Sequence, residues 1–284
     1  PRQPSSVPRY ARIVFPGLPH HVTQRGNRRE PVFFCNGDYP AYLSSLHEHA
    51  IRYAVDNGAK VLNLSFGKRY SSHQQVVDDA IKYAAAHDVL IIHAVGNDGE
   101  NCDSTDFYPQ TKFKDGGLAE NVMQVGCSLI TIDSQLAAVY SNYGKHTVDL
   151  FAPGDNSFGP LGGNHYGYSS GTSNAAPFVA GVAALLKSYF PELTMMQIKK
   201  IILETVYKPE IKVIRPHYID PALPPQRIAT LKNSGTLVPF SDLSISGGIP
   251  DAEAAVKKAI QLTKKTSNEI PIAGHFNQIK KGGH

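Results

Sequence analysis

The sequence predicts an α/β fold, a mainly parallel sheet flanked by helices, with a short β-rich appendage at its N-terminal end. Residues 61–66 and 89–92 are predicted to form short strands, and the run at 89–92 is apolar without alternation, which is typical of a strand in a parallel sheet that is covered on both faces. A stretch with apolar residues at helical spacing precedes each predicted strand, at 47–57 and at 74–87. Such alternation of helix and strand indicates a layered α/β domain.

The remaining elements follow from local signals along the chain. Asn57-Gly58 marks the end of the first helix, because glycine readily adopts the conformation that closes a helix. Thr194 is expected to cap a later helix, since its hydroxyl can accept a hydrogen bond from the helix backbone. Residues 209–245 hold six prolines and little periodicity, which indicates an extended excursion. The other strands are predicted at 121–127 and 147–151, and the other helices at 173–189, 194–206 and 251–263.

Composition excludes several classes of protein. The 42% hydrophobic and 18% charged shares are those of an ordinary globular chain, not of a disordered or fibrous one. No run approaches the ~20 apolar residues of a membrane-spanning helix, so no membrane partner is predicted. Cys35, Cys102 and Cys127 are too few for a disulfide framework and form no C-x-x-C pair. Neither a metal nor a cofactor is therefore predicted.

The strongest local signal is Gly171-Thr172-Ser173, which opens an Ala-rich helix. A serine in the first turn of a buried helix lies where backbone N–H groups are unpaired and where the helix dipole favours negative charge. Both features would stabilise the oxyanion that forms when the hydroxyl attacks a carbonyl group. Taken alone, however, the motif more often marks a serine that simply caps a core helix.

Two further motifs follow the ends of predicted strands. The string AVGNDG (94–99) comes directly after the strand at 89–92, and sites in parallel sheets form at the carboxyl ends of strands. Asn97 can therefore offer its side-chain NH₂ group to an oxyanion, although Asn-Asp-Gly alone more often marks a turn. The string NLSFG (63–67) ends the preceding strand, and Gly67 leaves the backbone free to pair with an extended peptide.

With these motifs in this order, the chain resembles the subtilases, the subtilisin family of serine peptidases, over residues 47–263. The resemblance rests on the order and spacing of VLNLSFG (61–67), IIHAVGNDG (91–99), Tyr108-Pro109, YSNYGKHTVDLFAPG (140–154), GTSNAAPFVAGVAALL (171–186) and SGGIPDAEAAVKKA (246–259). It implies a subtilisin-like parallel sheet and the hydrolysis of a polypeptide substrate through an acyl-enzyme.

The resemblance also implies roles for particular residues. Ser173 would be the nucleophile and Asn97 the oxyanion-hole donor, with the Ser173 backbone N–H as the second donor. Two strand ends would hold the substrate backbone and wall its primary specificity pocket: Ser65, Phe66 and Gly67 on one, and Ala94, Val95 and Gly96 on the other. Asn174 departs from the family pattern, which usually has a bulky apolar residue such as methionine at this position, so the packing beneath the nucleophile is in question.

The aspartate and histidine motifs of the family are absent from the sequence. Subtilases activate their serine with a histidine that an aspartate orients, and neither Asp-Ser/Thr-Gly nor His-Gly-Thr-His occurs here. His165 is expected to be a solvated loop histidine and not a substitute base. Because a serine without its base is a poor nucleophile, we expect a subtilisin-like domain that is incomplete at its N-terminal side and has no appreciable peptidase activity.

Residues 1–46 differ from the rest of the chain in charge. They hold six arginines against Glu30 and Asp38, which accounts for the whole formal net charge of +4. Short strands are expected near 12–15 and 20–24. Arginines interleaved with aromatic residues suit nucleic acid, so DNA or RNA is a partner expected only through residues 1–46, and a solvated basic tail is the alternative.

The segment from about residue 8 to residue 46 resembles the N-terminal strand of the single-tyrosine, HUH-type transposases, which act on single-stranded hairpin DNA. The His-hydrophobic-His motif and the catalytic tyrosine of that family are absent, so the resemblance does not support strand transfer or nicking. We therefore expect two parts, a transposase-like fragment at 1–46 and a subtilase-like domain at 47–284 that lacks its Asp/His front.

The point near residue 46 where the two parts meet bears on how the sequence arose and on what the chain does. Two incomplete enzymes joined near residue 46 predict a fused, truncated or misassembled reading frame, with exposed apolar sheet edges and poor solubility. Besides a serine endopeptidase that is inactive in this chain, two functions stay open: a non-catalytic peptide-binding remnant and a transposase-derived DNA-binding fragment. The family resemblance suggests a secreted or periplasmic origin, but the start of the chain shows no signal pattern, so the sequence assigns no location.

Overall fold

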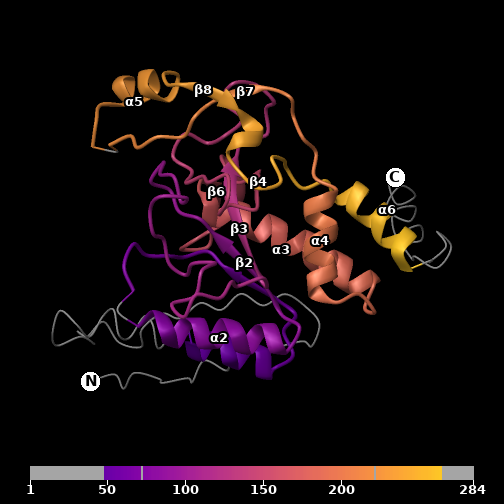
Figure 1. Ribbon diagram of the computed structural model, residues 1–284. Helices are drawn as coiled ribbons and strands as arrows, with labels where there is room; N and C mark the ends of the chain where they lie inside the picture. Colours follow the sequence, from indigo (N-terminus) through magenta and orange to yellow (C-terminus); the bar gives the residue numbers. More distant parts are fainter. Residues whose placement is uncertain (1–47, 72, 221, 264–284) are drawn as a thin grey trace, which may run out of the picture.

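The computed structural model describes residues 48–71, 73–220 and 222–263. At its centre lies a four-stranded parallel sheet in the order β1-β2-β3-β4 (Figure 1). These strands are β1 (Val61–Leu64), β2 (Leu90–Ala94), β3 (Val122–Ser128) and β4 (Leu150–Pro153). The predicted α/β class, a mainly parallel sheet flanked by helices, is confirmed.

One face of the sheet is covered by a helix at residues 48–56 and by α2 (Gln74–Ala86). Their apolar side chains pack against Leu62, Leu64 and Ile91, which are all buried. Neighbouring residues of a strand point to opposite faces of the sheet. The strand residues that alternate with Leu62, Leu64 and Ile91 therefore face the helices on the other side of the sheet. Burial on both sides explains why the strand sequences lack polar alternation.

The opposite face carries α3 (Thr172–Tyr189), α4 (Met195–Glu204) and α6 (Ala252–Thr263) (Figure 1). The helix α3 packs against all four strands of the sheet. Its sheet-facing side chains are small, and Ala175, Ala176 and Ala183 have no exposed surface. Small side chains let the helix axis approach the sheet closely, and this approach places the first turn of α3 at the carboxyl ends of the strands.

The helices and strands predicted within residues 47–263 are all present, with ends shifted by a few residues. The cap expected at Thr194 is confirmed. Its hydroxyl accepts a hydrogen bond from the Gln197 N–H at 3.1 Å, and its own N–H donates to Gln197 Oε1 at 2.8 Å. This reciprocal pair fixes where α4 begins.

Several short elements were not predicted from the sequence. An antiparallel hairpin, β5 (Ser157–Leu161) and β6 (His165–Ser169), leads into α3. The stretch 209–245, expected to be an extended excursion, contains β7 (Lys212–Ile214), α5 (Pro225–Lys232), β8 (Leu237–Pro239) and a 3₁₀ turn, Phe240–Asp242. The strands β7 and β8 have three residues each and pair with each other across a long loop, so the local sequence carries too little periodicity to indicate them.

The edge of the sheet at β1 differs from the expectation of exposed apolar residues. Within the described ranges, β1 pairs with β2 on one side and no strand pairs with its other side. Its apolar side chains are nevertheless buried, because they point to the covered faces and not along the edge. The strands expected near 12–15 and 20–24 lie outside the described residues.

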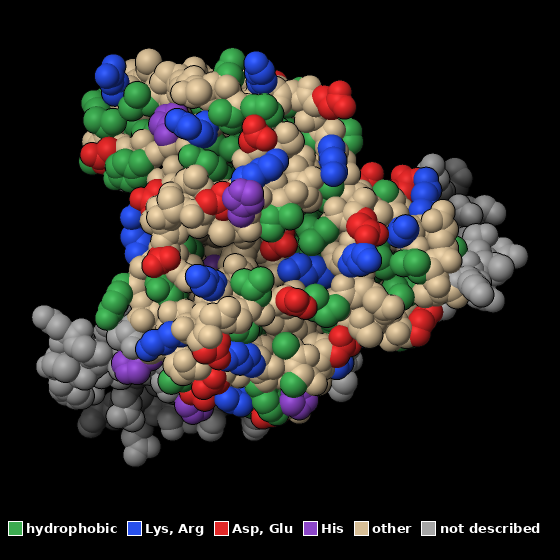
Figure 2. Space-filling view, viewed as in Figure 1, with side chains coloured by type: hydrophobic (Ala, Val, Ile, Leu, Met, Phe, Trp, Pro, Cys, Tyr) green, Lys and Arg blue, Asp and Glu red, His purple; other side chains and the backbone are tan. Residues whose placement is uncertain are grey.

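The surface of the described region mixes charges of both signs. Figure 2 shows basic and acidic side chains interspersed over the face in view, as the charge balance beyond residue 46 predicts. None of the helices in the described part of the chain is both long enough and apolar enough to cross a bilayer.

Gly154 is a point where the fold has no room for a side chain. A Cβ atom there would lie 2.7 Å from both the Ala175 nitrogen and the Gly171 oxygen at the start of α3. We therefore expect Gly154→Ala to destabilise the protein by roughly 1–3 kcal/mol. The matched control is Gly159→Ala, where the added carbon meets nothing within 4 Å. Urea unfolding of both variants checks this, and equal midpoints would contradict it.

Candidate active site

The first turn of α3 brings Ser173 and Asn97 together. A Cβ atom added to Gly171 would lie 3.1 Å from Ser173 Oγ and 3.5 Å from Asn97 Nδ2, so the two side chains converge on one point. Ser173 is half-buried in the helix, whereas Asn97 is exposed just beyond the end of β2. The structure thus places a hydroxyl and an amide donor side by side, although they are far apart in the sequence.

The Asn97 carboxamide is oriented by the helix. Its Oδ1 accepts hydrogen bonds from the Thr172 N–H at 2.8 Å and from the Thr172 hydroxyl at 3.1 Å. Gly171 stands at the N-cap of α3 and has no side chain to satisfy the helix N–H groups, so Asn97 supplies the missing cap from another segment. The oxygen accepts both bonds from Thr172, and the Nδ2 group donates no hydrogen bond within the described residues.

A second bond ties the end of β1 to the same helix turn. The Ser65 hydroxyl donates to the Ser173 carbonyl oxygen at 2.8 Å. In an unbroken helix this carbonyl would accept from residue 177, but Pro177 has no N–H. Asn63 Nδ2 donates to Ser65 Oγ at 2.8 Å, so the Ser65 proton is free to point to Ser173. Proline in the helix therefore creates the acceptor that holds the strand end.

The two predicted substrate-binding segments leave the sheet next to each other. Leu64 of β1 and His93 of β2 are partners in the parallel register, so residues 65–67 and 94–96 continue side by side. The Gly96 N–H donates to the Thr172 hydroxyl at 3.3 Å, which anchors the second segment to the start of α3. All eight residues singled out in the sequence therefore lie around the start of α3.

Asn174 packs in a way that suits its polar side chain. Its Nδ2 donates to the Ser169 hydroxyl at 3.0 Å and to the Gly154 carbonyl at 3.3 Å. These bonds join α3 to the end of β6 and to the segment after β4. The departure from an apolar residue is thus compensated by hydrogen bonds and leaves no unpaired amide donor beneath Ser173.

A buried histidine supports one of the strand ends. His93 has no exposed surface, and its ring nitrogens face Gln124 Oε1 at 2.6 Å and the Phe66 carbonyl oxygen at 3.0 Å. Burial lowers the pKa of His93 more than these two acceptors raise it. His93 was not predicted from the sequence as a site residue, although a polar side chain directly after the predicted apolar strand at 89–92 is a signal for one.

The described residues offer Ser173 no imidazole partner. No histidine among them makes a hydrogen bond to Ser173 Oγ, and His93 is committed to Gln124 and Phe66. His165 is exposed, as expected, but it lies in β6 and not in a loop. Nor do the described parts of the chain gather three or more His, Cys, Asp or Glu side chains in the geometry of a metal site.

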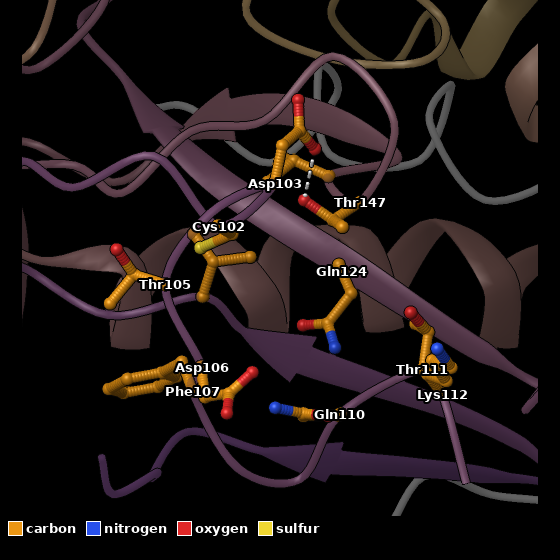
Figure 3. A pocket seen from close by; sticks show the side chains of 12 residues that line it. Cys102, Asp103, Thr105, Asp106, Phe107, Gln110, Thr111, Lys112, Gln124 and Thr147 are labelled. Atoms are coloured by element: carbon orange, nitrogen blue, oxygen red, sulfur yellow. Dashed lines mark hydrogen bonds between the residues drawn. The ribbon is translucent and has the colours of Figure 1, made fainter. Parts of the chain in front are cut away.

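A cavity of about 200 Å³ lies beside the second strand end, with Val95 in its lining. Figure 3 shows its lining, with Gln124 in the middle and the Phe107 ring at one end. Cys102 also lines it, and burial raises the pKa of this thiol to about 12, so the thiol stays protonated at neutral pH. The cavity is lined mostly by neutral side chains, together with Asp103, Asp106 and Lys112.

A serine in the first turn of a helix on a parallel sheet, with an amide donor at the adjoining strand end, has the features of a serine hydrolase of the α/β class. Comparison with known families agrees with this class. The model of the Subtilase family matches residues 37–255, and the chain belongs to this family. The match begins ahead of the boundary predicted at residue 46.

Curated relatives are similar over about half of the chain. The thermophilic serine proteinase of Bacillus sp. (strain AK1) is 42% identical over 139 residues, which cover 49% of this chain and 31% of the relative. Subtilisin BL of Lederbergia lenta is 34% identical over 157 residues, which cover 55% of this chain and 52% of the relative. The matched region thus spans about a third to a half of the length of these relatives.

Solved structures share the fold. The prenylagaramide maturation protease PagA superposes with a TM-score of 0.54 at 23% identity, over 75% of this chain and 67% of that structure. At this level of identity the likeness concerns the fold alone.

The contribution of the Asn97 oxygen to stability can be measured separately from any role of the Asn97 NH₂ group. We expect Asn97→Ala to destabilise the protein by about 1 kcal/mol, because the Thr172 N–H loses its acceptor. Asn97→Asp keeps an oxygen at the helix start and is expected to retain most of the stability, since a negative charge is favourable there. Thermal unfolding of both variants checks this. If Asn97→Asp were as unstable as Asn97→Ala, the cap would not be the source of the effect.

Burial of neutral His93 predicts a pH dependence of stability. The folded state binds this proton less readily than the unfolded chain, whose histidine pKa is about 6.5. The stability that neutral His93 contributes is therefore complete above that pH and is lost as the pH falls below it, by up to about 1.4 kcal/mol per pH unit. We expect His93→Gln to unfold with a weaker pH dependence between about pH 7.5 and 5. Parallel pH profiles in both proteins would disprove this.

Proposed function

We propose that the site around Ser173 is built for peptide-bond hydrolysis through an acyl-enzyme. The observation that carries the proposal is the convergence of Ser173 Oγ and Asn97 Nδ2 beside Gly171. In this proposal Ser173 attacks the carbonyl carbon of a polypeptide. The oxyanion accepts hydrogen bonds from Asn97 Nδ2 and from the Ser173 backbone N–H.

The substrate backbone would lie against the two strand ends. Residues 65–67 and 94–96 continue two neighbouring strands, so an extended peptide can lie along them and pair by backbone hydrogen bonds. Their positions are supported by the Ser65 bond to the Ser173 carbonyl and by the Gly96 bond to Thr172. Both bonds end in the first turn of α3, which also carries Ser173. The same helix turn therefore positions the proposed peptide-binding segments and the proposed nucleophile.

The chain by itself is proposed to be a slow catalyst or an inactive one. Serine attack needs a base to take the hydroxyl proton, and the described residues place no hydrogen-bonded imidazole on Ser173. An oxyanion hole with substrate binding alone gives only about 10³ to 10⁴ over the reaction in water. The family motifs that carry the aspartate and the histidine are also absent from the sequence.

Covalent labelling tests both the identity of the nucleophile and its activation. We expect a fluorophosphonate probe to modify Ser173 at a rate far below that of an active subtilisin used as control, because the described residues place no base on its hydroxyl. Ser173→Ala should abolish whatever labelling is seen, whereas Ser170→Ala, three residues away on the same approach to α3, should not. Intact-mass measurement over hours gives both rates.

Two outcomes would revise the proposal. Labelling of Ser173 as fast as in the control subtilisin would contradict the proposed inactivity and would require a base that activates Ser173. Peptide binding with no modification of Ser173 would favour a non-catalytic peptide-binding remnant instead. The DNA-binding alternative and the transposase resemblance concern residues 1–46, which lie outside the described residues, and no contact in the described region favours them.

A further inference from the structure

The ring of Phe107 occupies the gap between the two strand ends. A Cβ atom at Gly67 would lie 2.2 and 2.7 Å from Cε1 and Cζ of this ring. A Cβ atom at Gly96 would lie 2.8 Å from the same Cζ atom and 3.0 Å from Cε2. Carbon atoms pack best at about 3.5–4.0 Å, so the tip of the ring fills the space that both glycines leave open.

The backbone and the neighbouring rings hold Phe107 in this place. The residue that follows it, Tyr108, exchanges two backbone hydrogen bonds with Lys68, at 2.8 and 3.0 Å. Lys68 in turn follows Gly67 directly, so the bridge fixes Phe107 against the first strand end. The buried ring of His93 lies behind, with 6.2 Å between the ring centroids. The position of Phe107 is thus set by the fold and not by a surface rotamer.

The same ring also forms part of the wall of the cavity. The cavity of about 200 Å³ is lined by Phe107 together with Val95, Gln110 and Gln124 (Figure 3). One edge of the ring therefore faces the strand ends, and the residue also bounds the space that continues away from them. This places an aromatic side chain between the groove where a peptide backbone would lie and a volume large enough for a side chain.

We infer that Phe107 is a specificity-determining residue that closes the pocket for the substrate side chain next to the scissile bond. With Phe107 in place, that side chain has room for few atoms beyond its Cβ, so the preferred substrate carries glycine, alanine or serine there. Removing the ring joins the groove to the cavity and admits a large side chain. This inference rests on the proposed function, because it takes the segments 65–67 and 94–96 as the peptide groove.

Peptide boronic acids test the inference without requiring turnover, since boron forms a tetrahedral adduct with a serine hydroxyl. Two probes are compared, each with three alanines before a last residue that is either the alanine or the phenylalanine boronic acid. We expect the unaltered protein to bind the alanine probe about tenfold or more tightly than the phenylalanine probe. In Phe107→Ala the affinity for the phenylalanine probe should rise about tenfold or more, with little change for the alanine probe.

Matched variants make the result specific. Phe158→Ala removes an aromatic side chain that is 63% exposed on the β5–β6 hairpin and should leave both affinities unchanged. Phe107→Leu guards against misfolding of the alanine variant and should give an intermediate preference. Thermal unfolding confirms that each variant is folded before its affinities are compared.

The outcomes separate the inference from the proposed function. Equal affinities for both probes in the unaltered protein, unchanged in Phe107→Ala and Phe107→Leu, would overturn the inference and leave the proposed function standing. If no variant binds either probe, or if Ser173→Ala binds them as well as the unaltered protein does, the proposed function fails and the inference fails with it.

Discussion

The first N–H group of helix α3, that of Thr172, is paired by a side chain from a distant segment, and the rest of the site depends on this hydrogen bond. Gly171 at the N-cap has no side chain, so the Thr172 N–H is satisfied by Asn97 Oδ1 from the end of β2. Polar backbone groups in a protein interior must be paired, which makes this contact a structural requirement. The same contact fixes the Asn97 carboxamide near Gly171, where Ser173 Oγ also lies, so a stabilising bond also positions the proposed catalytic donor.

One intrahelical hydrogen bond is missing from the first turn of α3, and this absence has a similar effect. Pro177 frees the Ser173 carbonyl, and Ser65 at the end of β1 fills the place with its hydroxyl. The two strand ends are therefore joined to one helix turn by bonds that an ordinary, fully bonded helix would not need. His93 extends this arrangement beneath the surface, where it supports the Phe66 carbonyl from within the core. Stability and substrate placement share these contacts.

The sequence predicted the elements whose apolar pattern is long enough to be read locally. The helix α3 and the strands β1 to β4 are of this kind. Burial of a helix against the sheet gives apolar residues at helical spacing, and burial of a strand on both faces gives a largely apolar run without alternation. The hairpin β5–β6 and the pair β7–β8 are short or exposed, and their partners are chosen by tertiary contact. The site residues were predictable as ordered motifs, since the family resemblance supplied roles that no local pattern carries.

What the sequence by itself determined is therefore the class of fold, the family and the set of residues that gather at one sheet edge. The tertiary structure alone decided how these residues meet. That Asn97 Oδ1 caps α3, that Pro177 leaves an acceptor for Ser65, and that the Phe107 ring fills the gap between Gly67 and Gly96 all depend on contacts between segments far apart in the chain. The sequence specifies which side chains are present, but the distances between these side chains are set only when the sheet and the helix pack together.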